Sequence, residues 1–397
     1  MAPPTRPFIF DDTQIDRSQL RKTAFNLRWA TVEEDVIPLT AGEMDFPIAE
    51  PVSEAIQRHA REGYLGYCPK LGFETLREAI CEDLSNRSIS ASPDRILVLD
   101  GAAAALKAAC RAILNPGDEA VTFDPVDFLL PHCSELAGAK VLRCPVSPID
   151  GSINFEALES LISSKTKALL ICNPHNPTGR VLRKEELSAM ANLAEKHNLT
   201  IISDEVWSEI IIGTIPMTSI ASLSDEIRKR TITISGFSKS DGLSGMRVGY
   251  LHCENETIFN KIVDFSGVLD TTSGATALSQ VAAEAALKEG GPWRSSFVEH
   301  LKSLVPYTAD QLSQLAGVDC PKPEGTFLLF PSVSAFDMDC ESLAEFILTE
   351  ARVAVVPGAE RWFGSRAKGH LRLSVATSRS VVDAALERLS ALWGQQS

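Results

Sequence analysis

The middle of the chain alternates short apolar runs, rich in β-branched residues, with helical stretches. RILVLD (95–100) precedes the Ala-rich GAAAALKAACRAIL, and EAVTFDP, AKVLRCPV, KALLICNP, LTIISDE (199–205) and TITISGF (231–237) repeat the pattern of a buried strand followed by a breaker. Such alternation is typical of βαβ units, whose strands run parallel. The sequence therefore predicts an α/β domain on a mostly parallel sheet.

The length of 397 residues exceeds what one hydrophobic core usually serves, so we expect two domains. After about residue 280 the pattern changes to helices with a few strands, GTFLLFPSV, RVAVVPG and GHLRLSVA. This change predicts a large domain over 51–280 and a smaller α+β domain over 281–397. We expect residues 1–50 to join the smaller domain.

Composition and charge exclude several classes of protein. Hydrophobic residues at 44% and charged residues at 23% are ordinary for a soluble globular chain, and a net charge of −14 argues against nucleic-acid binding. The start, MAPPTRPFIFDDTQ, indicates neither a secretory signal nor a membrane span, so a cytoplasmic location is expected. The nine cysteines are scattered without a C-x-x-C pair, which predicts reduced core residues and no metal site.

Polar residues follow several of the expected strands, where open parallel sheets bind ligands. ICNPHNPTGR (171–180) must form a fixed loop, which is either an ordinary turn or a holder of asparagine amides toward a ligand. Asp204 and Glu205 follow another strand. A carboxylate at that depth needs a partner such as a protonated heterocyclic nitrogen, unless Ser203 or Asp204 simply caps a helix.

Lys239 lies in SGFSKSDGLSGMRVGY (235–250), where a surface lysine would also be acceptable. An amine that attacks an aldehyde must be neutral part of the time, which burial and a neighbouring cation both promote. Arg247 can supply that cation and grip a phosphate. DGAAAAL (100–106) opens a helix with residues small enough for an anion to approach its N–H groups, although alanine also simply favours helix.

In chain order, these motifs resemble the class I/II aminotransferase family, which has the type I fold of enzymes that use pyridoxal 5'-phosphate. The resemblance runs from IPLTAGEMDFP to LRLSVATSR, and it includes N-P-x-N-P-T-G, S-D-E, and S-K with an arginine eight positions after the lysine. It implies a large domain with a seven-stranded, mostly parallel sheet, a smaller α+β domain, and pyridoxal 5'-phosphate as cofactor.

The resemblance also implies roles for single residues. Lys239 is expected to bind the cofactor covalently and, once released, to move the Cα proton of an amino-acid substrate. Asp204 is expected to pair with the pyridine nitrogen, and Asn176 to donate to the phenolic oxygen. The phosphate is expected on Arg247, Ser238 and the N–H groups of Gly101, Ala102 and Ala103.

Three further positions match the family in its substrate and subunit contacts. Tyr67 in YCPKLGFETLR matches a residue lent to the neighbouring subunit's phosphate, which implies a homodimer with shared sites. Arg372 in HLRLSVA matches the arginine that binds the substrate α-carboxylate. Gly42 in AGEMDF lies in the stretch that closes over the same carboxylate.

The chain departs from the family at some contact positions. Trp207 stands where a tyrosine usually donates to the phenolic oxygen, and Gly236 stands where a phosphate-binding serine is common. In DPVDFLL the ring-stacking position falls on Asp127, with Phe128 beside it. Either the register shifts and Phe128 stacks, or an acidic group faces the ring, which would suggest a substrate with a cationic portion.

The lysine and the fold alone do not select a reaction, because this cofactor supports several. Transamination, from an amino acid to a 2-oxo acid, is the expected activity. The alternative is a lyase that performs β- or γ-elimination or replacement, since AGEMDFP and GYLGY look similar to the cystathionine β-lyase branch and the altered positions fit a specialised biosynthetic role. A non-catalytic regulator is disfavoured, because the lysine, its acidic partner and the arginines are all retained.

Overall fold

The computed structural model describes residues 8–147 and 151–394, so the first half of the MAPPTRPFIFDDTQ stretch lies outside the described residues. A seven-stranded sheet has the strand order β2-β8-β7-β6-β5-β3-β4. Six strands run parallel to one another, and β8 runs antiparallel to both of its neighbours. The seven-stranded, mostly parallel sheet predicted from the sequence is confirmed.

Six of these strands are the apolar runs named above. The seven are β2 (Ile96–Leu99), β3 (Glu119–Asp124), β4 (Lys140–Pro145), β5 (Thr166–Cys172), β6 (Thr200–Asp204), β7 (Thr231–Gly236) and β8 (Gly249–Cys253). The pattern did not predict β8, because GYLHC lacks the β-branched residues that mark the others. This strand joins β2 to β7 and completes the sheet.

Alternate residues of β5 pack into different hydrophobic clusters, one on each face of the sheet. Leu169 and Ile171 belong to the cluster with α7 (Lys184–Lys196), and Ala168 and Leu170 belong to the cluster with α4 (Ala102–Ile113). Side chains alternate along a strand, so a strand covered on both faces is apolar throughout. This explains why the sequence shows continuous apolar runs.

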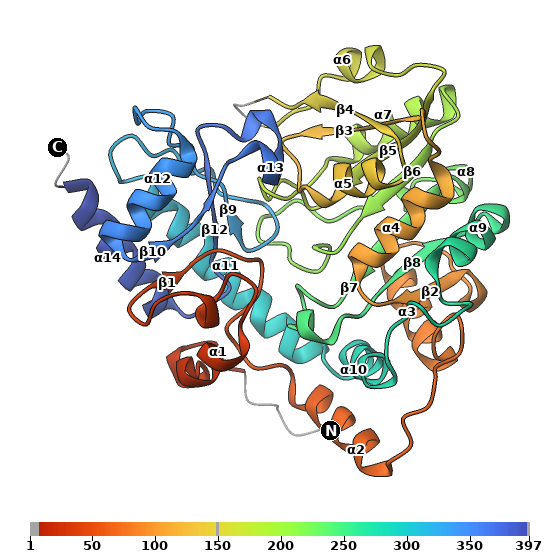
Figure 1. Cartoon of the computed structure of the whole chain (residues 1–397), viewed down its shortest axis with the longest axis horizontal. Coiled ribbons are helices and arrows are strands. Elements are labelled where there is room, and N and C mark those ends of the chain that lie inside the picture. Colours follow the sequence, from red (N-terminus) through yellow and green to blue (C-terminus); the bar gives the residue numbers. More distant parts are fainter. Residues whose placement is uncertain (1–7, 148–150, 395–397) are drawn as a thin grey trace.

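A second group of elements follows the long helix α11 (Gly291–Leu312), as Figure 1 shows. A small antiparallel sheet has the order β11 (Val356–Pro357), β12 (Leu371–Ser374), β9 (Leu328–Leu329). β1 (Ile37–Pro38) pairs in parallel with β10 (Val353–Ala354). Residues 37–38 therefore lie beside residues 353–354. The assignment of residues 1–50 to the smaller domain and the boundaries at 50 and 280 stay a proposal.

The other helices complete the layers. They are α1 (Arg17–Thr23), α2 (Glu50–Glu62), α3 (Glu74–Asn86), α5 (Leu129–Leu136), α6 (Phe155–Ser160), α8 (Asp225–Lys229), α9 (Glu256–Ser266), α10 (Ala277–Lys288), α12 (Cys340–Phe346), α13 (Glu360–Phe363) and α14 (Arg379–Gly394). Within residues 8–147 and 151–394, no helix combines the length and the apolar character needed to cross a membrane. The nine cysteines, all in that part of the chain, are free thiols.

Candidate active site

Three predicted site residues lie at the carboxyl ends of three neighbouring strands. β6 lies between β5 and β7, and Cys172, Asp204 and Ile234 are paired in register across them. Asn176 follows the end of β5, Asp204 ends β6, and Lys239 follows the end of β7. The parallel sheet therefore brings together residues that are far apart in the sequence.

The amine of Lys239 is enclosed between backbone and an aromatic ring. Its Nζ donates to the Gly42 carbonyl oxygen at 2.7 Å and lies 5.1 Å from the centroid of the Trp207 ring. A Cβ at Gly42 would meet Nζ at 3.1 Å and the indole at 3.3 Å, so a larger residue at this position would crowd both. Burial, and then the charge of Arg372, lower the pKa of Lys239. The lysine is therefore more easily neutral than a surface amine.

Asp204 lies in the same site without an ion-pair partner among the described residues. Its Oδ1 accepts from the Val206 N–H at 3.1 Å. Burial raises the pKa of Asp204 to about 7, and the nearby Asp127 carboxylate also raises it. The hydrogen bond from Val206 lowers the pKa, but by less than burial raises it. Residues 206–209 form a turn, so the alternative that Asp204 caps a helix is wrong. The site therefore offers a carboxylate that a cation from outside the chain can satisfy.

A chain of hydrogen bonds joins Asn176 to Arg372. Arg372 Nη1 donates to Asn176 Oδ1 at 3.3 Å, and Nη2 donates to the Thr40 carbonyl oxygen at 3.3 Å. The ring of Phe363 lies 5.1 Å from the guanidinium carbon. The Nε atom of Arg372 is buried and has no partner among the described residues. The guanidinium is therefore held in place with a donor still available for an anion.

Asp127 and Phe128 point to different surroundings. The Asp127 carboxylate accepts from Asn176 Nδ2 at 2.6 Å, whereas the Phe128 ring packs against Trp362 at 5.5 Å and His132 at 6.4 Å. Burial raises the pKa of Asp127, while Arg372 and Lys239 act against that shift. The carboxylate, and not the phenyl ring, is the group that contacts Asn176.

The first turn of α4 and Arg247 together form an anion-binding arrangement. Gly101 is the N-cap of α4, with a φ of 112° and no side-chain cap. A Cβ at Gly101 would lie 3.0 Å from Nη2 of Arg247, so the guanidinium rests directly on the start of the helix. The first-turn N–H groups of a helix and an arginine both favour an anion such as phosphate. Ser238 stands next to Lys239 in the loop after β7.

Gly249 allows β8 to touch the same end of α4, and this contact gives a stability prediction. A Cβ at Gly249 would lie 2.5 Å from the Ala102 nitrogen and 2.8 Å from the Gly101 carbonyl carbon. Backbone cannot yield as a flexible side chain does, so we expect Gly249→Ala to lower the free energy of unfolding by about 1–3 kcal/mol. Urea denaturation measures this loss. Gly291→Ala is the matched control, because its Cβ would meet no atom within 4 Å, and an equal loss there would contradict the prediction.

Tyr67 does not join this site within one chain. Its side chain is 92% exposed, and the neighbouring Tyr64 is 87% exposed. Tyr67 lines a separate hollow of about 690 Å³ with Asp100 and residues 271–278. Within one chain, the exposed Tyr67 side chain thus has no described contact with Lys239 or Arg247.

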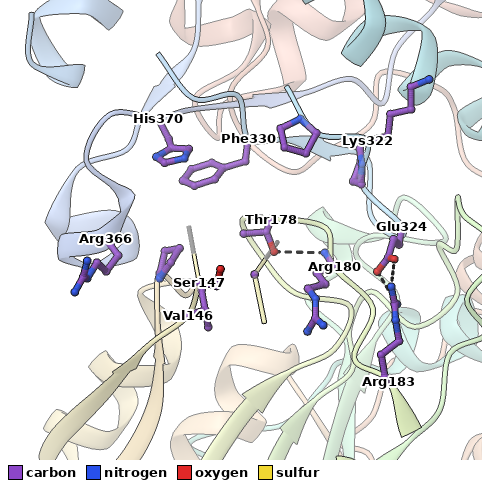
Figure 2. A pocket seen from close by; sticks show the side chains of 14 residues that line it. Val146, Ser147, Thr178, Arg180, Arg183, Lys322, Glu324, Phe330, Arg366 and His370 are labelled. Atoms are coloured by element: carbon purple, nitrogen blue, oxygen red, sulfur yellow. Dashed lines mark hydrogen bonds and ion pairs between the residues drawn. The ribbon is translucent and has the colours of Figure 1, made fainter. Parts of the chain in front are cut away.

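A further pocket, of about 420 Å³, is lined in part by Thr178 and Arg180 of the loop that follows β5 (Figure 2). Three of its cations already have carboxylate partners: Arg180 with Glu186, Arg183 with Glu324, and Lys322 with Asp310. None of the predicted site residues lines this pocket. The candidate active site is therefore the group of residues around Lys239.

Comparison with known proteins decides the family. A family model described as "Aminotransferase class I and II" matches residues 34–389. The chain belongs to this family. A putative aminotransferase, YugH, from Bacillus subtilis (strain 168) is 36% identical over 381 residues, which cover 95% of each chain. An aspartate aminotransferase from Thermotoga maritima is 39% identical over 364 residues, covering 90% of this chain and 91% of that one.

Solved structures of class I/II aminotransferases and related proteins share the fold. The T. maritima aspartate aminotransferase has a TM-score of 0.83 at 36% identity, covering 95% of each chain. Cystalysin from Treponema denticola, which contains pyridoxal 5'-phosphate, has a TM-score of 0.89 at 27% identity, covering 98% of this chain and 100% of that one. The type I fold, the enzyme class and the cofactor predicted from the sequence are thus confirmed. This aminotransferase depends on pyridoxal 5'-phosphate.

The described residues fit this cofactor at three points. An anion-binding helix start suits its phosphate, a buried carboxylate without a cation suits its ring nitrogen, and an amine with a lowered pKa suits its aldehyde. Two residues near the site were not predicted. Glu43, whose charge acts on Lys239, directly follows the predicted Gly42. Phe363 lies against the Arg372 guanidinium, and no local sequence pattern marks it.

Proposed function

We propose that the enzyme transfers the amino group of an amino acid to a 2-oxo acid at the site around Lys239. When bound, pyridoxal 5'-phosphate withdraws the electrons left on the substrate Cα after loss of its proton. One observation supports the proposal: Lys239, an amine with a lowered pKa, lies in the same site as Arg372. The guanidinium of Arg372 is held by hydrogen bonds and keeps one buried N–H donor available for the carboxylate of a substrate. The site thus holds the means both to anchor an amino acid and to move its proton.

Each residue receives a proposed task. Lys239 binds the cofactor and then carries the Cα proton, and Arg372 orients the substrate α-carboxylate with Gly42 in the adjacent stretch. Asp204 keeps the ring nitrogen protonated, and Asn176 donates to the phenolic oxygen. The rest of the cofactor contacts are proposed for Trp207, Ser238, Arg247, Gly101, Ala102 and Ala103. Asp127, and not Phe128, is proposed for the position beside the ring, because the Phe128 ring packs against Trp362 and His132.

A half-reaction tests this function. Holoenzyme is mixed with single amino acids in the absence of any oxo acid, and the products are separated by chromatography. Transamination gives one equivalent of pyridoxamine 5'-phosphate and of oxo acid, and then stops. Many turnovers with release of ammonia would instead establish the elimination lyase, the alternative suggested by the AGEMDFP and GYLGY stretches.

We infer further that two chains share their sites. Leu65 is 58% exposed, between Tyr64 and Tyr67, which are exposed still more, and such an apolar patch favours an interface. Tyr67 of the partner subunit would then complete the phosphate contacts.

We expect sedimentation equilibrium to give twice the chain mass, and Leu65→Glu to give monomers that bind the cofactor more weakly. A monomeric wild type with full activity would refute the shared site.

The cytoplasmic location expected from the sequence stays a prediction.

A further inference from the structure

Two hydrogen bonds fix the carboxylate of Asp127 in the active site, and a third holds its backbone. Its oxygens accept from Asn176 Nδ2 at 2.6 Å and from the Leu129 N–H at 3.0 Å. Its own N–H donates to the Asn176 carbonyl oxygen at 3.0 Å. An ionised carboxylate has about four acceptor positions, so two remain for another donor. The group is therefore oriented in advance and keeps the capacity to bind.

The charges around Lys239 are unequal in number. Besides the lysine itself, the charged groups that act on it most strongly are Arg372, Asp127, Glu43 and Asp204. Glu43 directly follows Gly42, whose carbonyl oxygen accepts from the lysine, and Glu43 Oε1 accepts from Asn26 at 3.4 Å. Among these groups of the described chain, three carboxylates thus accompany two cations.

A bound substrate and cofactor make this imbalance larger. Under the proposed function, the substrate α-carboxylate occupies Arg372, and the ring nitrogen pairs with Asp204. Lys239, released from the cofactor by the substrate amine, must be neutral in order to take the Cα proton. Asp127 and Glu43 are then left without a cation. A second carboxylate on the substrate would meet like charge, whereas a positive side chain would supply the missing partner.

We propose that Asp127 selects an amino-acid donor with a positively charged side chain over a dicarboxylate donor. This inference rests on the proposed aminotransferase function and adds the substrate class. It sets the chain apart from the relatives that carry the name aspartate aminotransferase. Arg372 serves the α-carboxylate of either donor, so the discrimination comes from the carboxylate beside it.

The test measures half-reactions of the holoenzyme with L-lysine, L-ornithine and L-arginine, with L-aspartate, and with neutral L-leucine. We expect kcat/KM for the best cationic donor to exceed that for aspartate by about 30-fold or more in the wild type. Asp127→Asn keeps the shape of the side chain and removes its charge, so the cationic-to-neutral ratio should fall by about tenfold or more. Asp337→Asn, at an exposed position, is the charge-matched control and should leave the ratio unchanged.

The ratio between donors in one variant separates selection from a general loss, because the shared chemistry cancels. An equal fall for all donors in Asp127→Asn would make the residue structural and overturn the inference. A wild type that prefers aspartate would overturn it while leaving the aminotransferase function intact. If no amino acid yields pyridoxamine 5'-phosphate, both the function and the inference fail.

Discussion

Lys239→Ala should lose at least about 10³-fold in kcat while the protein still folds. In the proposed mechanism the lysine meets the aldehyde and moves the Cα proton, and it is the one lysine found against the Trp207 ring among the described residues. Steady-state transamination measures the loss. Borohydride treatment followed by mass spectrometry should show the cofactor fixed to the peptide that contains Lys239 in the wild type only.

Lys302→Ala provides the control for this variant. Lys302 lies on α11 and pairs with Glu299 at the surface, so its removal should leave both activity and cofactor attachment unchanged. Near-normal activity in Lys239→Ala would remove the assignment of the lysine. A thermal unfolding transition similar to that of the wild type would show that the loss is chemical.

Asp204→Asn should lower kcat by about 10²–10³-fold, the second largest effect we expect. A neutral amide would not keep the ring nitrogen protonated. The cofactor ring would then stabilise less of the negative charge that develops at Cα. The hydrogen bonds that position Arg372 do not involve Asp204, so KM should change little. Loss of activity through KM alone would contradict the role given to Asp204. Asp225→Asn is a control carboxylate at the surface.

Asp204→Asn should also change how the stability of the cofactor-free protein depends on pH. Burial raises the pKa of Asp204 to about 7 from an ordinary value of 3.8, so the folded protein binds this proton more tightly than the unfolded chain does. The stability from this group is present below pH 4 and is lost as the pH rises toward 7. The melting temperature of the cofactor-free wild type should therefore fall more between pH 5 and 8 than that of Asp204→Asn. Parallel curves would contradict the raised pKa.

The strands and the main site residues were predictable because they follow local rules. A strand covered on both faces is apolar throughout, and the carboxyl ends of parallel strands meet at one edge, so the positions of Asn176, Asp204 and Lys239 follow from pattern and topology. The family resemblance added the identity of the cofactor. It also directed attention to Arg372, which is far away in the sequence.

Other features were not predictable because they depend on packing between distant segments. β8 carries no strong strand pattern and is defined by its two antiparallel neighbours. The choice between Asp127 and Phe128 depends on rotamers set by Asn176 on one side and Trp362 on the other. A repeating local pattern carries no information about either contact.

The main chain just after β1 accepts hydrogen bonds from two basic side chains of the site. The carbonyl oxygen of Thr40 accepts from Arg372, and the carbonyl oxygen of Gly42, two residues later, accepts from Lys239. Rotation of the intervening peptide planes would alter both contacts together. A substitution that distorts this short segment would therefore disturb the guanidinium and the amine at the same time.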